Sequence, residues 1–247
     1  MKVAILGGTK GMGRSMARLF AERGDAVCLL GRDQADLDRS AEDLRSRNGV
    51  EKTHVAVVLC DLAKPYEFGA VLDAADHLLE GLDTVVVTAA MFATQDALEN
   101  DVSLTEQLLT INFTNTVQFC EEARKRLLAR GGGTLCVFSS VAGERGRKPI
   151  VLYGATKAGL SAYLEGLDHK FHDQGLRTIC VKPGFVKTGM TAGLKPPPFA
   201  GEPDDVARRV LVAIDKGKPV VYAPSMWALV MLVIRHLPRA VMRRIGF

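Results

Sequence analysis

Six short apolar runs rich in β-branched residues recur along the chain, at residues 2–6, 27–30, 55–59, 84–87, 134–138 and 177–181. Runs of this length, bounded by glycine or polar residues, are typical of strands that are buried on both faces. Helical patterns separate them, among them residues 35–47, 65–79 and 104–128. Strands that alternate with helices pair in parallel, because each helix carries the chain back to the same edge of the sheet. We therefore expect an α/β fold, a doubly wound parallel sheet with helices on both faces.

The chain has no internal repeat and no linker, so we expect one domain over residues 1–247. Its length is enough for one sizeable core, and 47% apolar and 24% charged residues are ordinary for a globular protein. The five cysteines are an odd number without metal-ligand spacing and lie mostly inside apolar runs. They indicate reduced core residues in a cytoplasmic protein, and we expect no metal site. No signal peptide precedes the first run, and the longest apolar run, 226–234, is too short to span a bilayer.

A glycine-rich turn follows the first apolar run and precedes a helical segment. Gly7, Gly11 and Gly13 are spaced as GxxxGxG. A strand, a glycine turn and a helix in this order direct backbone N–H groups and a helix N-terminus toward an anion, which indicates a dinucleotide phosphate site. Lys10 and Met12, inside the turn, belong to the same predicted site.

The end of the second run bears on which dinucleotide is bound. A carboxylate there would bind the adenosine ribose hydroxyls, whereas an arginine accommodates a 2′-phosphate. Gly31 occupies the position of the acid and Arg32 follows it, with Lys10 as a second cation nearby. This pattern favours NADPH/NADP as the cofactor, with NADH as the alternative. In the other interpretation, both cations are solvated surface charges.

Further ligand contacts are expected at the ends of later runs, because open parallel sheets bind ligands outside the carboxyl ends of their strands. The remaining predicted cofactor residues are Asp61, Leu62, Ala89, Pro183, Gly184, Val186 and Thr188. Asn112 is a polar residue in the middle of a helical pattern. It is either a functional group or a core amide whose hydrogen bonds are satisfied by neighbouring backbone.

A tyrosine and a lysine four residues apart follow the fifth run. If the segment is helical, Tyr153 and Lys157 share one face, and the ammonium would lower the pKa of the phenol by favouring the phenolate. Ser140, after the fifth run, would place a hydroxyl next to that phenol. Together these groups form a predicted site that polarises a carbonyl and donates a proton. A tyrosine and a lysine at this spacing also occur by chance, which is the alternative.

In this order and spacing, the motifs resemble those of the short-chain dehydrogenase/reductase family over residues 1–190. They are Gly7-x-x-x-Gly11-x-Gly13, Asp61, Asn112, Ser140, Tyr153-x-x-x-Lys157 and Pro183-Gly184-x-x-x-Thr188. The resemblance implies a Rossmann fold that uses NAD(P)H and that usually assembles into homodimers or homotetramers. The chain departs from the family pattern at Val87-Thr88-Ala89-Ala90, where Asn-Asn-Ala-Gly is usual, and at Leu6, where a threonine often precedes the first glycine.

The resemblance also implies a role for each catalytic position. Tyr153 would be the general acid/base, and Ser140 would polarise the substrate carbonyl. Lys157 would hold the nicotinamide ribose and lower the pKa of the phenol, and Asn112 would anchor a water molecule of the proton relay. Residues 183–188 would hold the nicotinamide carboxamide.

The second half of the chain resembles one branch of that family, the decaprenylphosphoryl-2-keto-pentose reductases, which are the reductase partners of decaprenylphosphoryl-ribose 2′-epimerase. The similarity lies in residues 139–145, 153–160, 216–218, 223–224 and 235–239. It implies a polyprenyl-phosphate-linked 2-keto sugar as the substrate and a partner oxidase. The alternatives are another hydrophobic carbonyl compound, such as a 3-oxoacyl thioester, and a nucleotide-binding scaffold without turnover. The complete set of four predicted catalytic residues argues against the scaffold.

The chain ends in a basic, apolar tail over residues 225–247. Six cations and no acidic residue lie after position 215, so the tail carries the excess charge and the first 215 residues have a net charge of −2. Arg235, Arg239 and Arg243 would gather near one face of a helix interrupted at Pro238. Such a segment suits peripheral contact with the inner face of the cell membrane. The alternatives are packing on the core or in a dimer interface; nucleic-acid binding is not expected, because no recognition module accompanies the charge.

Two loops near the catalytic motifs complete the predictions. Arg145, Arg147 and Lys148 precede Tyr153 and would either hold the phosphate of the substrate or form a solvated basic loop. Residues 190–205, which include three consecutive prolines, follow the predicted nicotinamide loop and are expected to form part of a substrate lid.

Overall fold

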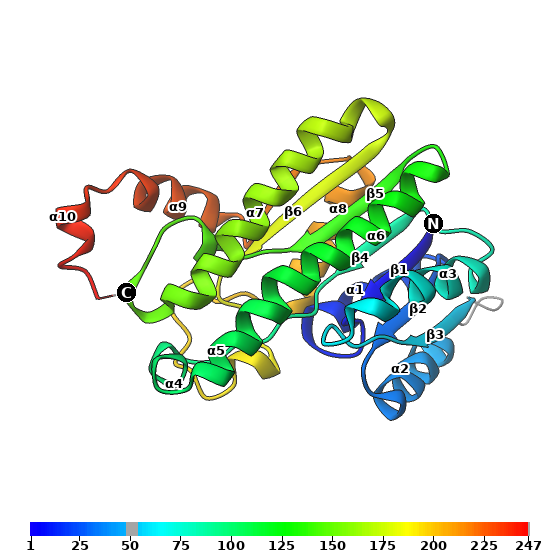
Figure 1. Cartoon of the computed structure of the whole chain (residues 1–247), viewed down its shortest axis with the longest axis horizontal. Helices are drawn as coiled ribbons and strands as arrows, with labels where there is room; N and C mark the ends of the chain where they lie inside the picture. The colour runs from blue at the N-terminus through cyan, green and yellow to red at the C-terminus, as the bar shows by residue number, and fades with distance from the viewer. Residues whose placement is uncertain (48–53, 247) are drawn as a thin grey trace.

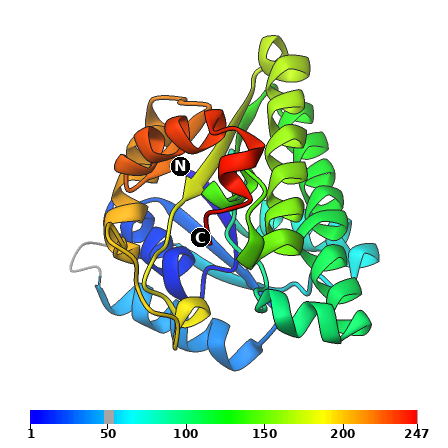
Figure 2. The same ribbon diagram turned by 90° about the vertical axis from the view of Figure 1, so that its left-hand side faces the viewer.

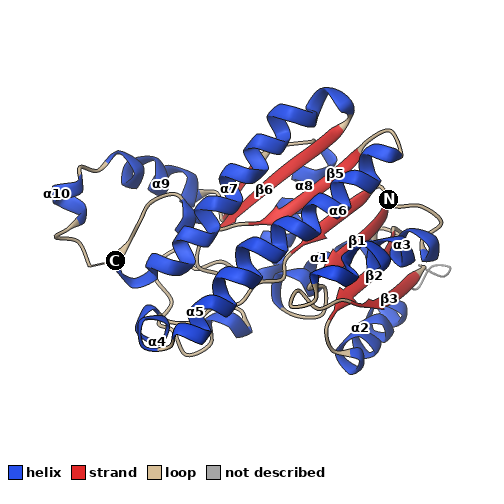
Figure 3. Ribbon diagram, viewed as in Figure 1, coloured by secondary structure: helices blue, strands red, loops and turns tan. Residues whose placement is uncertain are grey.

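A parallel sheet lies between two layers of helices in the computed structural model, which describes residues 1–47 and 54–246 (Figure 1 and Figure 3). Its seven strands are in the order β3-β2-β1-β4-β5-β6-β7. They are β1 (Lys2–Leu6), β2 (Ala26–Gly31), β3 (Val55–Leu59), β4 (Thr84–Val87), β5 (Gly133–Phe138), β6 (Leu176–Pro183) and β7 (Val220–Ala223). Each neighbouring pair is parallel. The predicted doubly wound α/β fold is confirmed, and all six predicted strands are present.

The sequence analysis did not predict β7, which is an edge strand. Its four residues are too few to show the pattern of a longer strand, and its first residue is exposed. It pairs with β6, where Pro183 lies opposite Ala223. The strand thereby brings the C-terminal segment of the chain to the carboxyl end of β6.

Helices cover both faces of the sheet. They are α1 (Gly11–Glu22), α2 (Gln34–Arg47), α3 (Phe68–Leu78), α4 (Gln95–Asn100), α5 (Val102–Leu109), α6 (Thr116–Ala129), α7 (Val151–Phe171), α8 (Pro203–Asp215), α9 (Met226–His236) and α10 (Arg239–Met242). Side chains alternate along β1, so that Val3 and Ile5 pack with α1, α2 and α8, whereas Ala4 and Leu6 pack with α3, α6 and α7. The cysteines, all five of them buried and free, belong to these two cores, as predicted.

The helix predicted over residues 104–128 is divided in the structure. A π-helical turn, Thr110–Asn115, separates α5 from α6. Such a turn adds a residue to the helical repeat and is frequent at functional sites. Here its two asparagines, Asn112 and Asn115, are buried and hydrogen-bond to the loops that follow β4 and β3. The sequence pattern did not predict this turn, because the apolar spacing on both sides of it remains helical.

The C-terminal segment crosses the carboxyl edge of the sheet. Figure 2 shows the molecule from the left-hand side of Figure 1, with α9 and α10 in red. Met231 and Ile234 of α9 are buried against Val141, which follows β5. The predicted interruption at Pro238 is confirmed, since α9 ends at His236 and α10 begins at Arg239. One face of the tail therefore packs on the body of the protein, which was one of the alternatives; Phe247 lies outside the described residues.

No helix in residues 1–47 and 54–246 combines the length and the apolar character needed to cross a bilayer.

Candidate active site

The glycine turn after β1 is packed too closely for any side chain at two of its positions. A Cβ on Gly13 would lie 2.1 Å from the carbonyl oxygen of Gly7 and 2.5 Å from Oγ1 of Thr88. A Cβ on Gly7 would lie 2.7 Å from the same hydroxyl, and Gly11 has a positive φ of 51°. Glycine is therefore required for the turn to bring α1 this close to the ends of β1 and β4.

Thr88 explains how the chain accommodates its departure from the usual family motif. Its hydroxyl lies 3.1 Å from the carbonyl oxygens of both Leu6 and Gly7, to which it donates. The backbone N–H of Ala89 donates to the Leu6 carbonyl at 3.1 Å. These bonds join the carboxyl ends of β1 and β4, so a threonine replaces an asparagine without separating the two strands.

The predicted nicotinamide loop lies over the glycine turn. The methyl carbon of Thr188 would be 3.3 Å from a Cβ on Gly11, although 177 positions separate the two residues in the sequence. Thr191 holds the loop in place, because its hydroxyl accepts a hydrogen bond from the Thr188 N–H at 3.0 Å and donates to the Val186 carbonyl at 2.7 Å. The structure thus brings together two predicted parts of the cofactor site that are distant in the sequence.

The predicted lid is only partly a loop. Residues 203–205 form the first turn of α8, which begins at Pro203. Gly189–Thr191 forms a short 3-10 turn, and Leu194 and Phe199 are exposed on the segment between these elements. Gly201 is buried and hydrogen-bonds to Phe185 and Lys187, so the segment that remains available for a lid is residues 192–200.

The two cations predicted for the cofactor's 2′-phosphate, Arg32 and Lys10, differ in their ion pairing. Arg32 is exposed, and no carboxylate of the described residues lies within ion-pair distance of it. Lys10, predicted as a second cation for the cofactor, instead pairs with Asp36 at 2.7 Å. Asp33 accepts a hydrogen bond from the Asp36 N–H at 2.8 Å at the start of α2. Asp33 is therefore engaged in capping, which makes it a poor replacement for the absent ribose-binding acid.

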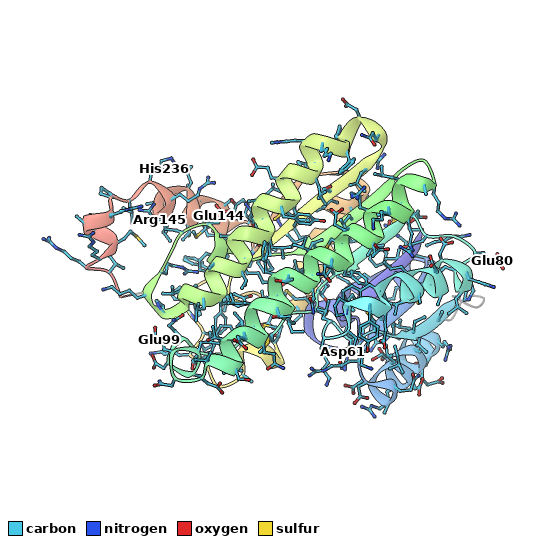
Figure 4. The ribbon with its side chains drawn as sticks, viewed as in Figure 1. Asp61, Glu80, Glu99, Glu144, Arg145 and His236 are labelled. Carbon is cyan, nitrogen blue, oxygen red and sulfur yellow. The ribbon has the colours of Figure 1, made fainter. Side chains whose placement is uncertain are left out.

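Two further predicted cofactor residues lie in the loop after β3. Asp61 is partly exposed at the carboxyl end of that strand and accepts a hydrogen bond from the Ala63 N–H at 2.9 Å (Figure 4). Leu62 is buried, and Asn115 donates to its carbonyl at 2.6 Å. The π-helical turn thus positions this loop through Asn115, a residue that the sequence analysis did not single out.

Ser140, Tyr153 and Lys157 come together where β5 and α7 meet. Ser140 follows the end of β5, and its hydroxyl lies beside the phenol of Tyr153 in the first turn of α7. The same hydroxyl accepts a hydrogen bond from the Ala142 N–H at 3.0 Å. The Lys157 ammonium lies one turn further along α7, 5.8 Å from the centre of the Tyr153 ring. The ring of Phe92 packs edge-on against Tyr153, with 5.3 Å between the ring centres. The structure brings the three polar groups to one place, and their catalytic roles stay predictions.

The predicted direction of the Tyr153 pKa is wrong. Burial raises the pKa of Tyr153 to about 12, and the nearby Ser140 hydroxyl only partly opposes this effect. Burial also lowers the pKa of Lys157 to about 8. The physical reason is that desolvation disfavours the charged form of each group, while the Lys157 ammonium donates to the Phe138 carbonyl at 2.9 Å rather than to the phenol.

Asn112 has the hydrogen bonds of a satisfied core amide. Its side chain is 1% exposed, accepts from the Met91 N–H and donates to the Met91 carbonyl, both at 2.8 Å. It thereby fixes the loop that presents Phe92 to Tyr153. These contacts match the alternative prediction, in which Asn112 is a core amide satisfied by neighbouring backbone. A role for Asn112 in a proton relay stays a prediction.

The family is decided by comparison with known sequences. A sequence model of the family described as short chain dehydrogenase matches residues 1–198. The chain belongs to the short-chain dehydrogenase family. An uncharacterised oxidoreductase of Mycobacterium tuberculosis (strain CDC 1551 / Oshkosh) is 32% identical, over 98% of this chain and 96% of the relative. Carbonyl reductase family member 4 of Xenopus laevis is 27% identical, over 86% of this chain and 90% of the relative.

Solved structures agree on the fold. A short-chain type dehydrogenase/reductase from Mycobacterium ulcerans superposes with a TM-score of 0.80 at 20% identity, covering 89% of this chain and 86% of that one. A tryptophan variant of actinorhodin polyketide ketoreductase, solved with NADPH, has a TM-score of 0.79 at 22% identity, covering 90% and 95%. The short-chain dehydrogenase described here is an NAD(P)-dependent oxidoreductase with a Rossmann fold.

Besides Asn115, sequence reasoning missed two positioning residues near Tyr153 in this short-chain dehydrogenase. Gln95 is buried, and its side-chain carbonyl accepts from the Leu152 N–H at 3.1 Å, which ties α4 to the start of α7 next to Tyr153. Ser139 donates to the Lys157 carbonyl at 2.9 Å and so holds β5 against α7. A polar residue directly before Ser140 was visible in the sequence, whereas nothing in the sequence connected Gln95 with α7.

The C-terminal part of this short-chain dehydrogenase also contacts the active-site loops. Glu144 lies four residues after Ser140, at the junction of α9 with the body (Figure 4). Its nearly buried carboxylate pairs with Lys182 of β6, lies 3.2 Å from the Arg235 guanidinium and accepts from the Tyr222 hydroxyl at 3.1 Å. Arg235 is therefore occupied by this ion pair and does not belong to a free basic face of the tail, contrary to the prediction.

Proposed function

We propose that this oxidoreductase is a carbonyl reductase that prefers NADPH. When bound, the reduced nicotinamide supplies a hydride to the carbonyl carbon, and the substrate leaves as an alcohol. Tyr153 donates a proton to the carbonyl oxygen, and Ser140 donates a hydrogen bond to the same oxygen. The observation that carries the proposal is the position of the Ser140 hydroxyl beside the Tyr153 phenol, because it brings two hydroxyl donors together beside the cofactor loops. The 27% identity to a carbonyl reductase supports the same substrate class.

The surrounding residues fit a dinucleotide. The close packing of Gly7 and Gly13 leaves backbone N–H groups at the start of α1 for the phosphates. We assign Lys157 to the nicotinamide ribose, Asn112 to a water molecule of the proton relay and residues 183–188 to the carboxamide. With a pKa of about 8, Lys157 is mostly charged at neutral pH, and with a pKa of about 12, Tyr153 keeps the proton that it must donate.

The preference for NADPH rests on Arg32. This guanidinium is exposed directly after Gly31, where an acid that binds the ribose hydroxyls would otherwise stand. An exposed arginine without a carboxylate partner is suited to bind a 2′-phosphate. Lys10 contributes less to this site, because its charge is paired with Asp36.

The substrate that we propose is a 2-keto sugar linked to a polyprenyl phosphate, supplied by a partner oxidase. The support comes from the basic residues Arg145 and Lys148, which lie on the segment between Ser140 and Tyr153. An anionic group attached to the substrate would be attracted to this segment. A 3-oxoacyl thioester is the alternative substrate, and its hydrophobic chain would make no use of the basic residues.

A lipid-linked substrate requires contact with a membrane, for which we propose the outer face of α9. Leu229 and Val233, one turn apart on this face, are 60% and 57% exposed, and Met226 lies next to them. The cations Arg239 and Arg243 follow at the end of the tail. An anionic lipid surface matches both features, because it takes up apolar side chains and attracts cations.

We also propose that the protein forms homodimers or homotetramers. Leu109 and Phe113, on α5 and the π-helical turn, expose apolar surface next to α7. A second copy of the chain would cover this surface. The molar mass in solution, measured by light scattering, tests the proposal, and a monomer at micromolar concentration would contradict it.

Matched tyrosine variants test the reductase proposal. With NADPH and the polyprenyl-phosphate keto sugar, we expect Tyr153→Phe to lower kcat by about a hundredfold to ten-thousandfold, the usual contribution of a general acid. Tyr66→Phe is the control, because Tyr66 is 79% exposed on the surface. Mass analysis should show the reduced lipid only with wild type and the control. Turnover by Tyr153→Phe equal to that of wild type would refute the assignment of the acid.

A further inference from the structure

A basic pocket lies between the loop that precedes α7 and the last helix, α10. It has a volume of about 460 Å³. One wall is formed by residues 145–148 and the other by residues of α10 and its C-terminal end. Five of the side chains that line it are cationic, and none is acidic: Arg145, Arg147, Lys148, Arg239 and Arg243.

Four of the five cations of the pocket have no carboxylate partner among the described residues. Arg145 donates to the Leu237 carbonyl at 2.8 Å, and Lys148 donates to the Arg243 carbonyl at 2.6 Å. These acceptors are backbone dipoles, so they orient the two cations without cancelling their charge. Within residues 1–47 and 54–246, no carboxylate comes within 4 Å of Arg145, Lys148, Arg239 or Arg243.

The nearest carboxylate in the sequence is directed elsewhere. Glu144 precedes Arg145, but its carboxylate forms ion pairs with Lys182 and Arg235 and accepts a hydrogen bond from Tyr222. The same contacts fix the start of the loop and the end of α9, and these two segments carry the walls of the pocket. The pocket is mostly apolar inside and surrounded by cations, so it is suited to bind an anion that carries an apolar group.

The chemistry of the lining indicates what kind of anion the pocket can bind. Besides the cations, Val151 and Met242 line the pocket, and the aliphatic stems of arginine and lysine add apolar surface. Guanidinium groups bind phosphate through paired hydrogen bonds. A phosphate ester with an attached hydrocarbon chain would use both kinds of surface, whereas a free inorganic phosphate would use only the charges.

We propose that this pocket binds the phosphate of a phosphorylated lipid and is the subsite for the phosphate of the substrate. The second half of this proposal rests on the proposed function. Val151 begins α7, and Tyr153 follows two residues later, so the pocket adjoins the segment that carries the proposed acid. Because its walls come from residues 145–148 and 239–243, the subsite exists only when the tail is docked on the body.

Binding is measured on the full chain through its single tryptophan, Trp227 of α9, the helix that precedes the pocket wall formed by α10. The probes are farnesyl phosphate, farnesol, inorganic phosphate and a single-stranded oligonucleotide. We expect farnesyl phosphate to bind at least about tenfold more tightly than farnesol or inorganic phosphate, a difference of about 1.4 kcal/mol. Equal affinity for farnesyl phosphate and farnesol would overturn the phosphate site, and preferred binding of the oligonucleotide would replace it by a nucleic-acid site.

Charge-matched variants locate the site. Arg239→Gln with Arg243→Gln removes two positive charges from the pocket, and Lys170→Gln with Arg208→Gln removes two from exposed positions on α7 and α8. We expect the first pair to weaken farnesyl phosphate binding by about tenfold or more and the second pair to leave it unchanged. Lys148→Gln alone, which leaves the sequence of α10 unchanged, should weaken binding in the same direction. Unchanged binding in both pocket variants would overturn the proposal.

Measurements of turnover distinguish the phosphate subsite from the proposed reductase function. We expect the pocket variants to raise KM for a phosphorylated keto lipid while leaving KM for a neutral ketone unchanged. If the phosphorylated keto lipid is reduced with the same KM by the pocket variants, the subsite is refuted and the proposed function stands. If farnesyl phosphate binds in the pocket but no phosphorylated keto lipid is reduced, the pocket stands as a phospholipid site and the proposed substrate is refuted.

Discussion

The indole nitrogen of Trp227 lies so close to Gly184 that a Cβ on Gly184 would be only 2.0 Å from it. Trp227 belongs to α9, and Gly184 directly follows Pro183, the last residue of β6. The indole N–H is buried and has no hydrogen-bond acceptor among the described residues. The tail is therefore packed directly on the loop that we assign to the nicotinamide.

This contact predicts that Gly184→Ala displaces Trp227. A methyl group at this position would force the indole or the loop to move, and overpacking of this kind costs about 1–3 kcal/mol. We expect a lower melting temperature and a shifted tryptophan emission. Gly189→Ala is the matched control, because a Cβ there would have no atom within 4 Å and its stability should change by less than about 0.5 kcal/mol. Equal stability of the two variants would contradict the packing described.

Lys157 predicts a specific dependence of stability on pH. Burial lowers the pKa of Lys157 from 10.5 in the unfolded chain to about 8 in the folded protein. Below pH 8 the group is charged in both states, so the folded state carries the full cost of burying the charge. Between pH 8 and 10.5 the unfolded state binds more protons, so stability rises with pH, by up to about 3 kcal/mol in total.

Comparison with Lys157→Met isolates this contribution, because all other titrating groups are shared. We expect the unfolding free energy of wild type, measured in urea, to increase relative to that of the variant as pH is raised from 7 to 10. A difference between the two proteins that stays constant over this range would rule out the lowered pKa.

The same group should set the upper pH limit of carbonyl reduction. Tyr153, with a pKa of about 12, retains its proton across this range, whereas Lys157 loses its proton near pH 8. We expect kcat/KM for the ketone to be constant below pH 8 and to fall above it. Lys157→Arg keeps the charge at all these pH values and should remove the break from the profile, even if its activity is lower. A break at the same pH in both proteins would assign it to another group.

Arg32 should discriminate between the two nicotinamide cofactors. Arg32→Ala removes an exposed guanidinium without disturbing a salt bridge of the described residues. We expect KM for NADPH to rise about tenfold, which corresponds to about 1.4 kcal/mol, with KM for NADH unchanged. Lys10→Gln should have a smaller effect, because Lys10 is paired with Asp36. A similar change for both cofactors would show that Arg32 does not contact the 2′-phosphate.

The outer face of α9 should determine membrane binding. Leu229→Asp with Val233→Asp places two charges on exposed positions and should reduce sedimentation with anionic vesicles by about tenfold or more. The control is Leu78→Asp with Val212→Asp, on exposed apolar positions of α3 and α8. Deleting the tail would be a poorer test, because α9 covers Val141 and Gly184. Equal sedimentation of the two double variants would exclude this face.

Local sequence was sufficient to predict most of the sheet and the positions of the polar groups. Each predicted strand is a continuous apolar run, and such a run can be stable only where both of its faces are covered. The four-residue spacing of Tyr153 and Lys157 brings them together on any helix, and Ser140 is close to them in the chain because only a short segment joins β5 to α7. These features depend on neighbours in the sequence, so the sequence alone determined them.

Other features depend on contacts between distant parts of the chain, and only the tertiary structure decided them. The pKa of Tyr153 is raised because its surroundings exclude water, which the nearby Lys157 could not indicate. The partners of Lys10 and Arg235, which are Asp36 and Glu144, come from other elements. The basic pocket requires residues 145–148 and 239–243 to meet. Burial and long-range ion pairs arise when distant segments pack together, so they cannot be inferred from the residues next to them in the sequence.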